Sequence, residues 1–309
     1  MFKIIRLLAK ASTLIWLSVC IPAWAADEAI LQHKFTSQQG NTIVLADFIG
    51  VKPVYLKFYA TWCQPCNEQM PHFQKAYTKL GEQIAFIAVN INLNETDEAI
   101  LAMQQKYNMQ MPIIKDHSGQ LASLFGLSGT PMHVLIDKNE KVIHRGHTVD
   151  QQLEQKLAGL KQSGSQTETH LTAQPTQLPD WIKQNQPQLL YFSATWCDWY
   201  LADSRPEQSQ RCIAGQQFIN KLAKQYSNLK ITGLMSNLWT EQKDIIEYQQ
   251  KFDSTIPMRV DNNNQLFSHF KIEQLPVLLL IEQGKIIWRK SDFNQTDTLP
   301  EHLIRKAVN

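Results

Sequence analysis

The sequence predicts an α/β protein made of two domains that repeat one fold. Apolar runs of strand length alternate with stretches in which apolar residues recur at helical spacing. A pattern of the first half returns in the second at an offset of 145 residues, so that Gln104-Gln105-Lys106-Tyr107 matches Gln249-Gln250-Lys251-Phe252. Chance similarity does not keep its register through helix, loop and strand together. With 309 residues, the chain has the length of two ordinary domains.

Composition narrows the class of protein. Apolar residues make up 43% of the chain, which is enough to build folded cores and argues against disorder. The 30 basic and 28 acidic residues nearly balance, so nothing suggests a nucleic-acid partner. Residues 161–176 are rich in Gln, Ser and Thr, a composition typical of a linker. We therefore expect one domain over residues 26–160 and a second over residues 177–309.

Residues 1–25 have the pattern of a cleavable signal peptide. Lys3 and Arg6 charge its start, an apolar run covers residues 11–21, and Ala23-Trp24-Ala25 has the small-x-small form of a cleavage site. The run is short for a membrane span, which makes an uncleaved anchor facing the periplasm the less favoured alternative. We expect an exported, periplasmic protein that loses Cys20 and keeps four cysteines in an oxidising compartment.

The motif Thr61-Trp62-Cys63-Gln64-Pro65-Cys66 is the centre of the first domain. It joins a strand-like apolar run at 54–59 to a helical pattern, which places Cys63 at a helix N-terminus. There, unpaired N–H groups and the helix dipole stabilise a thiolate. Cys66, three residues on, can reach the first sulfur. A dithiol switch needs this arrangement, with Cys63 attacking and Cys66 resolving the mixed disulfide.

Two other interpretations of this motif are weaker. A zinc site would normally require a second Cys-x-x-Cys pair, and the chain has none. A purely structural disulfide would gain little, because such a short loop restricts the unfolded chain less than a long one. We therefore expect neither a metal nor a cofactor.

The other elements of the first domain follow from local patterns. An apolar stripe after Cys66 predicts a helix that Pro71 should kink. Strands are expected within 35–45 (two, around a turn at Gly40), and at 54–59, 84–89, 133–137 and 142–143; helices are expected after Cys66, around 100–107 and at 151–160.

The second half repeats the cysteine motif in altered form. Ala194-Thr195-Trp196-Cys197 matches the residues that lead to Cys63, and the resolving position falls on Cys212. Residues 198–211 then form an insertion, which Pro206 predicts to be a loop. A disulfide that pins this loop is the favoured interpretation and would contribute about 3 kcal/mol. A second redox centre and a pair of free thiols are the alternatives.

These motifs resemble the TlpA/ResA branch of the thioredoxin superfamily. The resemblance in the first domain rests on residues 35–50, on Phe58-Tyr59-Ala60-Thr61-Trp62-Cys63-Gln64-Pro65-Cys66 and on Phe125-Gly126-Leu127-Ser128-Gly129-Thr130-Pro131. The second domain is similar to a divergent thioredoxin, chiefly over residues 270–285. The resemblance implies a central mixed β-sheet flanked by helices in each domain. It also implies that Thr130-Pro131 and Leu275-Pro276 are cis peptides packed against the cysteines, with Pro276 beside the second pair.

The resemblance also suggests roles for neighbouring residues. Trp62, Pro65, Thr130 and Pro131 would line a substrate groove, although simple packing is an alternative for Trp62. Thr130 would pair with an extended substrate segment.

Members of the family often carry a glutamate three residues after the second cysteine, where this chain has Gln69 and, one earlier, Glu68. Lys57 replaces the buried aspartate of thioredoxin. Lys57 and Glu68 are therefore candidates for tuning the thiol pKa, unless the Lys57 amine simply reaches water. His72, His133, His144 and His147 are expected at the surface or at sheet edges.

The function expected from these observations is disulfide reduction by an exported thiol–disulfide oxidoreductase. Its substrates would be exported proteins with disulfides, and a membrane thiol–disulfide protein would donate the electrons. The alternative is a client-binding or scaffold protein of the cell envelope. A peroxidase is less favoured because Ala60 stands where that activity needs a threonine. The direction of electron flow depends on the stabilities of both redox forms, which the sequence does not reveal.

Overall fold

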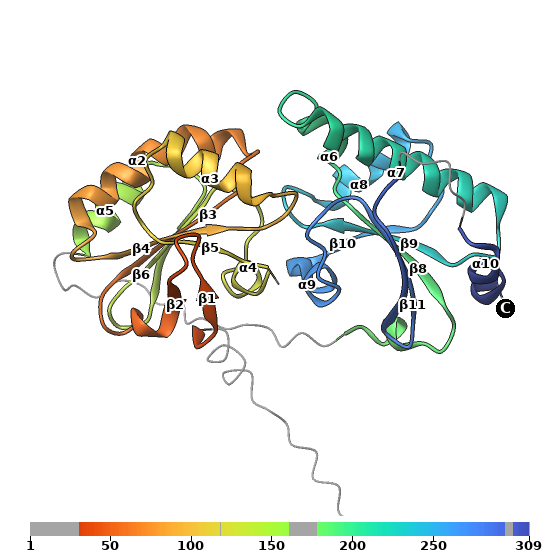
Figure 1. Ribbon diagram of the computed structural model, residues 1–309, viewed down its shortest axis with the longest axis horizontal. Coiled ribbons are helices and arrows are strands. Elements are labelled where there is room, and N and C mark those ends of the chain that lie inside the picture. The colour runs from red at the N-terminus through yellow and green to blue at the C-terminus, as the bar shows by residue number, and fades with distance from the viewer. Residues whose placement is uncertain (1–30, 118, 161–177, 294–298, 309) are drawn as a thin grey trace, which may run out of the picture.

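The computed structural model describes residues 31–117, 119–160, 178–293 and 299–308. The predicted signal peptide (1–25) and linker (161–176) lie outside these residues. Figure 1 shows two α/β units side by side, and each is built on one five-stranded sheet. The predicted architecture, a mixed β-sheet flanked by helices in each half, is confirmed.

The first unit has the sheet order β5-β4-β3-β6-β7, in which β3, β4 and β5 run parallel, β6 runs antiparallel to β3, and β7 runs antiparallel to β6. Strands β1 and β2 form a separate antiparallel pair. Its elements are β1 (Lys34–Thr36), β2 (Thr42–Val44), η1 (Leu45–Asp47), β3 (Val54–Tyr59), α2 (Gln64–Leu80), β4 (Ala85–Asn90), α3 (Asp97–Lys106), β5 (Ile113–Lys115), α4 (Gln120–Leu124), β6 (Met132–Ile136), β7 (Val142–Gly146) and α5 (Gln151–Gly159). Helix α2 continues through Pro71 as one element.

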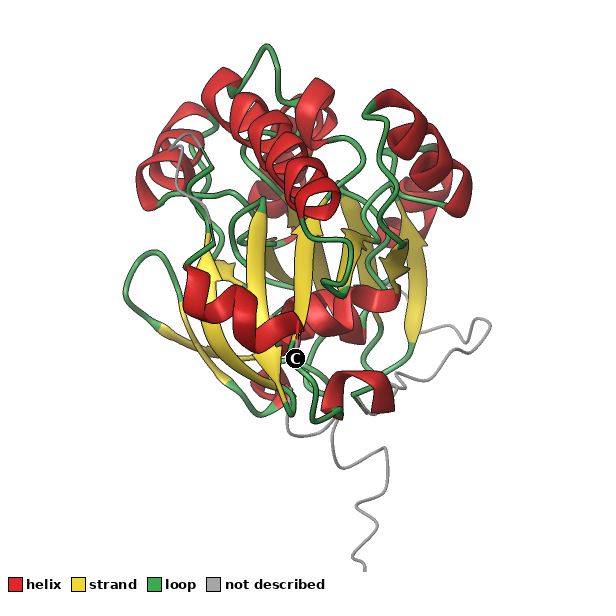
Figure 2. Cartoon of the chain, turned by 90° about the vertical axis from the view of Figure 1, so that its right-hand side faces the viewer, coloured by secondary structure: helices red, strands yellow, loops and turns green. Residues whose placement is uncertain are grey.

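The second unit repeats this topology, because its order β10-β9-β8-β11-β12 matches the first sheet strand by strand. Figure 2 shows its strands with helices packed against them. Its elements are η2 (Asp180–Lys183), β8 (Gln188–Ser193), α6 (Cys197–Tyr200), α7 (Pro206–Gln225), β9 (Ile231–Ser236), α8 (Gln242–Lys251), β10 (Met258–Asp261), η3 (Asn262–Asn264), α9 (Gln265–His269), β11 (Val277–Glu282), β12 (Lys285–Lys290) and α10 (Glu301–Val308). In the described part of the chain, no helix is long and apolar enough to cross a bilayer.

The predicted loop at 198–211 is wrong for most of its length. Helix α6 covers its first residues, and α7 begins at Pro206, so only residues 201–205 are non-helical. Proline suits the first position of a helix, because its N–H would have no partner there and its φ is already helical. Cys212 therefore lies inside α7 rather than at the end of a loop.

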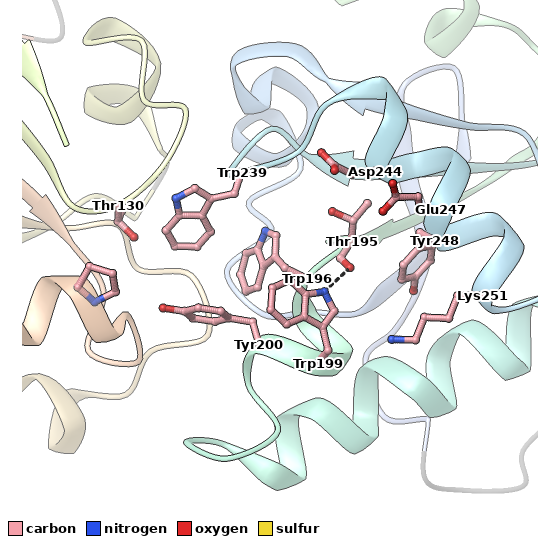
Figure 3. A pocket seen from close by; sticks show the side chains of 11 residues that line it. Thr130, Thr195, Trp196, Trp199, Tyr200, Trp239, Asp244, Glu247, Tyr248 and Lys251 are labelled. Carbon is pink, nitrogen blue, oxygen red and sulfur yellow. Dashed lines mark hydrogen bonds between the residues drawn. The ribbon is translucent and has the colours of Figure 1, made fainter. Parts of the chain in front are cut away.

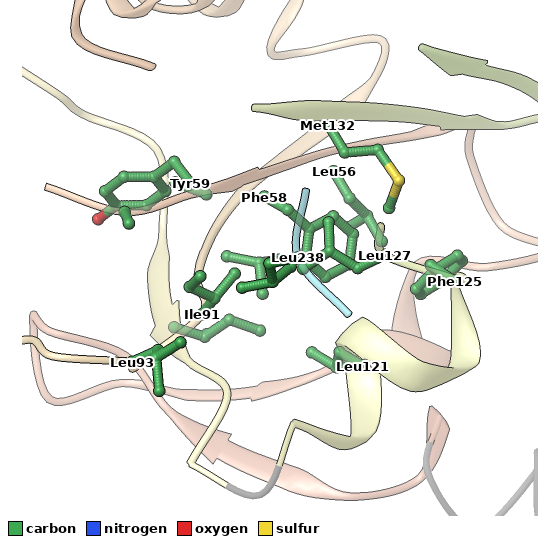
Figure 4. Packing of buried hydrophobic residues seen from close by; sticks show 14 of the residues in the cluster. Leu56, Phe58, Tyr59, Ile91, Leu93, Leu121, Phe125, Leu127, Met132 and Leu238 are labelled. Carbon is green, nitrogen blue, oxygen red and sulfur yellow. The ribbon is translucent and has the colours of Figure 1, made fainter. Parts of the chain in front are cut away.

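The two units share part of one hydrophobic core. Figure 4 shows Leu238 of the second unit among Phe58, Ile91 and Leu127 of the first. All four side chains are buried. Burying a leucine is worth about 2 kcal/mol, so this contact helps hold the units together.

Candidate functional site

Cys63 lies between β3 and α2, and Cys66 lies in the first turn of α2. Cys63 is the N-cap of α2, with extended backbone, and its Sγ accepts a hydrogen bond from the Cys66 N–H at 3.2 Å. Pro65 occupies the first turn of the helix. The two cysteines form a disulfide of 2.10 Å and are fully buried. The arrangement is that of a dithiol pair in its oxidised form.

The loop before β6 completes this face of the first domain. Thr130-Pro131 is a cis peptide, as the resemblance implied, and so is Leu275-Pro276 in the second domain. The Thr130 hydroxyl is buried without a hydrogen-bond partner among the described residues. The Pro131 carbonyl lies 2.8 Å from Nδ1 of His147. Thr130 therefore keeps unused polar groups beside the cysteines.

Lys57 is completely buried in β3, the central strand of its sheet. Its ammonium nitrogen has no hydrogen-bond partner among the described residues and lies 5.8 Å from the centroid of the Phe73 ring. Burial lowers the Lys57 pKa to about 7. The interpretation in which its amine reaches water is therefore wrong.

His133 pairs with Lys57 across the sheet, on β6. Its ring nitrogens lie 2.7 Å from the Tyr55 hydroxyl and 2.7 Å from Oε1 of Gln69. Burial, with the charge of Lys57 as the next cause, lowers its pKa to about 2, so it stays neutral. The expectation of a surface or sheet-edge position is wrong for His133, which is buried on the inner strand β6, whereas His144 is buried but lies on the edge strand β7. Spacing alone did not reveal that β6 is covered on both faces.

Gln69, at the family's glutamate position, and Glu68, one residue earlier, differ in their surroundings. Glu68 is exposed and accepts a hydrogen bond from the Gln64 side chain at 3.0 Å. Gln69 instead binds His133 and donates to the His147 carbonyl at 3.2 Å. Gln69 thus ties α2 to β6, which follows the cis proline, and to the segment between β7 and α5.

Glu95 is a site residue that the sequence analysis missed. Its buried carboxylate accepts hydrogen bonds from the Thr61 N–H at 2.5 Å, the Thr61 hydroxyl at 2.6 Å and the Asn90 amide at 3.0 Å. Burial raises the Glu95 pKa, and these bonds oppose the rise. Glu95 stands in no motif. The one available signal is that the residues after parallel neighbours β3 and β4 meet at the same sheet edge.

The two domains meet through their cysteine-bearing faces in an approximately twofold arrangement. The Asn94 N–H donates to the Glu273 carbonyl at 2.7 Å, and the Trp239 N–H donates to the Ser128 carbonyl at 2.8 Å. Asn94 and Trp239 are 145 residues apart, and so are Ser128 and Glu273. The two bonds therefore join positions that correspond in the sequence repeat. The contact therefore resembles the self-complementary interface of a homodimer.

Trp62 and Trp196 occupy the centre of this contact. Their rings stack with centroids 5.0 Å apart and planes 28° from parallel. The Trp62 indole donates to the Leu93 carbonyl at 2.8 Å, and the Trp196 indole donates to the matching Leu238 carbonyl at 2.7 Å. In this structure Trp62 is thus packed between the domains.

The chain around the start of α7 covers Cys63. The Tyr200 hydroxyl accepts a hydrogen bond from the Gln64 N–H at 3.1 Å, at the first residue of α2. Arg205 donates to the Thr61 hydroxyl at 2.7 Å and lies 3.9 Å from the Glu95 carboxylate. The second domain therefore forms hydrogen bonds with Thr61 and Gln64, the residues on either side of Trp62-Cys63.

We expect the double variant Tyr200→Phe/Arg205→Gln to expose Cys63. Each lost hydrogen bond weakens the closed state by about 1 kcal/mol, so the reduced protein should react with iodoacetamide at Cys63 about tenfold faster or more. The control is Tyr226→Phe/Arg305→Gln, which removes the same groups outside the interface. Equal alkylation rates in both double variants would contradict the covering role.

The second cysteine pair is also a disulfide, and both residues are buried. The free-thiol interpretation is therefore wrong for this structure. In the neighbouring cis-proline loop, the Leu275 N–H donates to Oδ1 of Asn94 at 2.7 Å, and its carbonyl accepts from Gln208. The backbone groups that a substrate would need here are already occupied.

A cavity of about 550 Å³ lies between the domains and reaches Pro65, the residue before Cys66, although neither Cys63 nor Cys66 lines it. Pro65 and Thr130 contribute its domain-one wall, and the rest comes from the second domain. Figure 3 shows that this second wall is largely aromatic. Of the four predicted groove residues, Pro65 and Thr130 thus line a cavity, whereas Trp62 and Pro131 do not.

Comparison with known proteins places the similarity in the first domain. Residues 26–145 match the AhpC/TSA family. The thiol-disulfide oxidoreductase ResA of Bacillus thuringiensis subsp. konkukian is 36% identical over 124 residues, which are 40% of this chain and 70% of the relative. ResA of Halalkalibacterium halodurans is 29% identical over 139 residues, 44% of this chain and 77% of the relative.

Solved structures match a similar share of the chain. StoA from Bacillus subtilis aligns with 19% identity and a TM-score of 0.36, covering 40% of this chain and 92% of its own. A candidate thiol:disulfide interchange protein DsbE from Chlorobium tepidum aligns with 27% identity and a TM-score of 0.37. The alignment covers 41% of this chain and 92% of that protein.

Proposed function

This chain belongs to the ResA-type thiol–disulfide oxidoreductases of the thioredoxin-like AhpC/TSA family, and on that premise we propose that it reduces disulfides of exported proteins through Cys63 and Cys66. The observation that carries the proposal is the position of Cys63 at the N-cap of α2, with Cys66 bonded to it. The N-terminus of a helix favours a thiolate, which is the form that attacks a disulfide.

The proposed reaction moves two electrons from the dithiol to the substrate. The Cys63 thiolate attacks one sulfur of the substrate disulfide, forming a mixed disulfide and releasing one substrate thiolate, which takes up a proton. The Cys66 thiolate then attacks the Cys63 sulfur, which re-forms the Cys63–Cys66 disulfide and releases the second substrate thiol. A thiol–disulfide protein of the membrane would return the pair to its reduced form.

The Thr130 backbone is the proposed docking edge for the substrate. Within the described residues its N–H and carbonyl make no hydrogen bond, so both are free to pair with an extended segment beside Cys63. The second domain would act as a cover and as part of the binding surface. Its own cysteine pair would be structural, since the Leu275 backbone is already bonded and Cys212 lies inside α7.

Export of the chain is part of the proposal and rests on the pattern of residues 1–25, with a periplasmic location and an uncleaved anchor as the alternative. A client-binding role without turnover is the second candidate function. The closed contact between the domains supports it, because both cysteines are covered.

Insulin reduction separates the two candidates. Protein reduced with dithiothreitol should accelerate precipitation of the insulin B chain over dithiothreitol alone, and the Cys63→Ser variant should not. A wild type with both thiols titratable and no acceleration would favour the binding role. Peroxide consumption by the same samples tests the peroxidase alternative, which the buried Ala60 disfavours.

A further inference from the structure

The cavity next to Pro65 of the cysteine motif has walls from both domains. Pro65 stands between the two cysteines, and Thr130 precedes the cis proline. Across from them lie side chains of α6, α8 and the loop that holds Trp239 (Figure 3). A peptide segment bound beside the disulfide would therefore touch the second domain as well as the first.

The twofold pattern of the domain contact breaks at this cavity. Asn94 and Trp239 occupy matching positions, both with positive φ, 54° and 49°. The Asn94 side chain accepts a hydrogen bond from the Leu275 N–H, so this backbone group is not available to a substrate. The Trp239 indole instead lies over Gly129, so closely that a Cβ on Gly129 would stand 2.4 Å from its nitrogen. Thr130, the counterpart of Leu275, keeps its backbone and its buried hydroxyl unpaired among the described residues.

An aromatic wall faces these unpaired groups. Trp196, Trp199, Tyr200 and Trp239 all line the cavity, and Figure 3 shows their rings between Thr130 and α8. Trp199 is 58% exposed and Trp239 38%. Large exposed aromatic side chains that gather at a cavity mark a binding surface. The buried side chain of Tyr248 lies at the same cavity.

The far wall of the cavity carries net negative charge. Asp244 and Glu247 lie one turn apart on α8 and both line it. The one cationic residue of the lining, Lys251, forms an ion pair with the buried Asp198 carboxylate. Two carboxylates thus remain beyond that pair: that of Asp244, which also accepts the Glu241 N–H at 2.6 Å in the capping box of α8, and that of the exposed Glu247. Aromatic faces and carboxylates together attract a cation, through the ring quadrupole and through charge.

We propose that this cavity binds a lysine or arginine side chain that flanks the cysteine of a disulfide-bonded substrate, so that cationic segments are the preferred substrates. The inference rests on the proposed function of Cys63 and names the substrate class of that site. A segment paired with the Thr130 backbone directs one neighbouring side chain toward the aromatic wall. The cavity is present while Cys63 is fully buried, so binding in it is measured without uncovering Cys63.

The test uses the oxidised protein and two peptides without cysteine, Gly-Ser-Arg-Ala-Ser-Gly and Gly-Ser-Glu-Ala-Ser-Gly. Binding is followed by tryptophan fluorescence. The Arg peptide should bind about fivefold more tightly than the Glu peptide. Glu247→Gln should reduce that preference about threefold, and Trp199→Leu should reduce both the preference and the fluorescence change. The control Glu301→Gln removes an exposed carboxylate of α10 outside the cavity and should keep the full preference.

Equal binding of the two peptides by the wild type would overturn the proposal, as would a full preference in Glu247→Gln. Either result leaves the function of the cysteine pair untouched, because neither peptide contains cysteine and the Cys63–Cys66 pair stays oxidised in this assay. Conversely, a failed insulin assay with an intact preference for the Arg peptide would remove the proposed function and leave the cavity as a cation-binding site.

Discussion

Replacing Cys66 by serine is expected to stop turnover and leave Cys63 joined to its substrate. In the proposed reaction only the Cys66 thiolate releases the mixed disulfide, and its N–H already lies 3.2 Å from the Cys63 sulfur. Insulin reduction should fall by about a hundredfold or more, because a serine hydroxyl does not attack a disulfide. Mass spectrometry without reductant should find one substrate chain per protein molecule, attached at Cys63.

Two controls give this result its meaning. Cys63→Ser should form no adduct and show no turnover, so an adduct through Cys66 in that variant would reverse the two roles. Cys197→Ser/Cys212→Ser should still reduce insulin while losing about 3 kcal/mol of stability, if that disulfide only ties α6 to α7. A folded double variant with no activity would instead make the second pair part of the electron path.

Local patterns predicted most of the fold because the long strands are continuous apolar runs and the long helices carry apolar residues at helical spacing. The internal repeat extended that prediction to the second domain. The loop predicted from Pro206 was wrong because a proline is typical both of loops and of the first turn of a helix. Only the residues packed around α7 decide between the two. Strand β5 and helix α4, of three and five residues, were not predicted, because neither shows a period and β5 is not part of a hairpin of the kind that the turn at Gly40 indicated for β1 and β2.

The candidate site was predictable only where its residues share a motif. The Cys63 N-cap and the cis Thr130-Pro131 peptide both follow from motif residues. Glu95 and the covering Arg205 come from distant segments, and folding alone brings them to Thr61. The wall opposite Thr130 depends on how two domains dock, which no pattern within one domain encodes. The sequence repeat did not predict that docking either, because matching faces need not meet.

Lys57→Met is expected to make the protein more stable at neutral pH. The Lys57 pKa falls from 10.5 to about 7 in the folded protein because the amine is buried. Between these two values the unfolded chain binds a proton that the folded protein does not, so the stability of the wild type rises with pH across this window. The slope is about 1.4 kcal/mol per pH unit. Below pH 7 and above pH 10.5 Lys57 has the same protonation in the folded and unfolded states, so it no longer contributes to the slope of stability against pH.

Urea unfolding at several pH values measures this contribution as a difference between proteins. Methionine has nearly the volume of lysine and carries no charge, so Lys57→Met should exceed the wild type by on the order of 3–5 kcal/mol at pH 7. The gap should close as the pH approaches 10. Lys79→Met, which removes an exposed amine from α2, should show no such gap. A constant difference from pH 7 to pH 10 would mean that Lys57 titrates near its ordinary pKa.

The same variant decides whether Lys57 takes part in thiol chemistry. With a pKa of about 7 the amine is present in both forms at neutral pH. A charged amine in the strand that leads to Cys63 would favour the thiolate, and a neutral amine would accept the Cys66 proton. If either holds, the pH dependence of Cys63 alkylation shifts to higher pH in Lys57→Met or the resolving step slows. If the thiol titrates unchanged and resolution keeps its rate, the buried amine acts on stability alone.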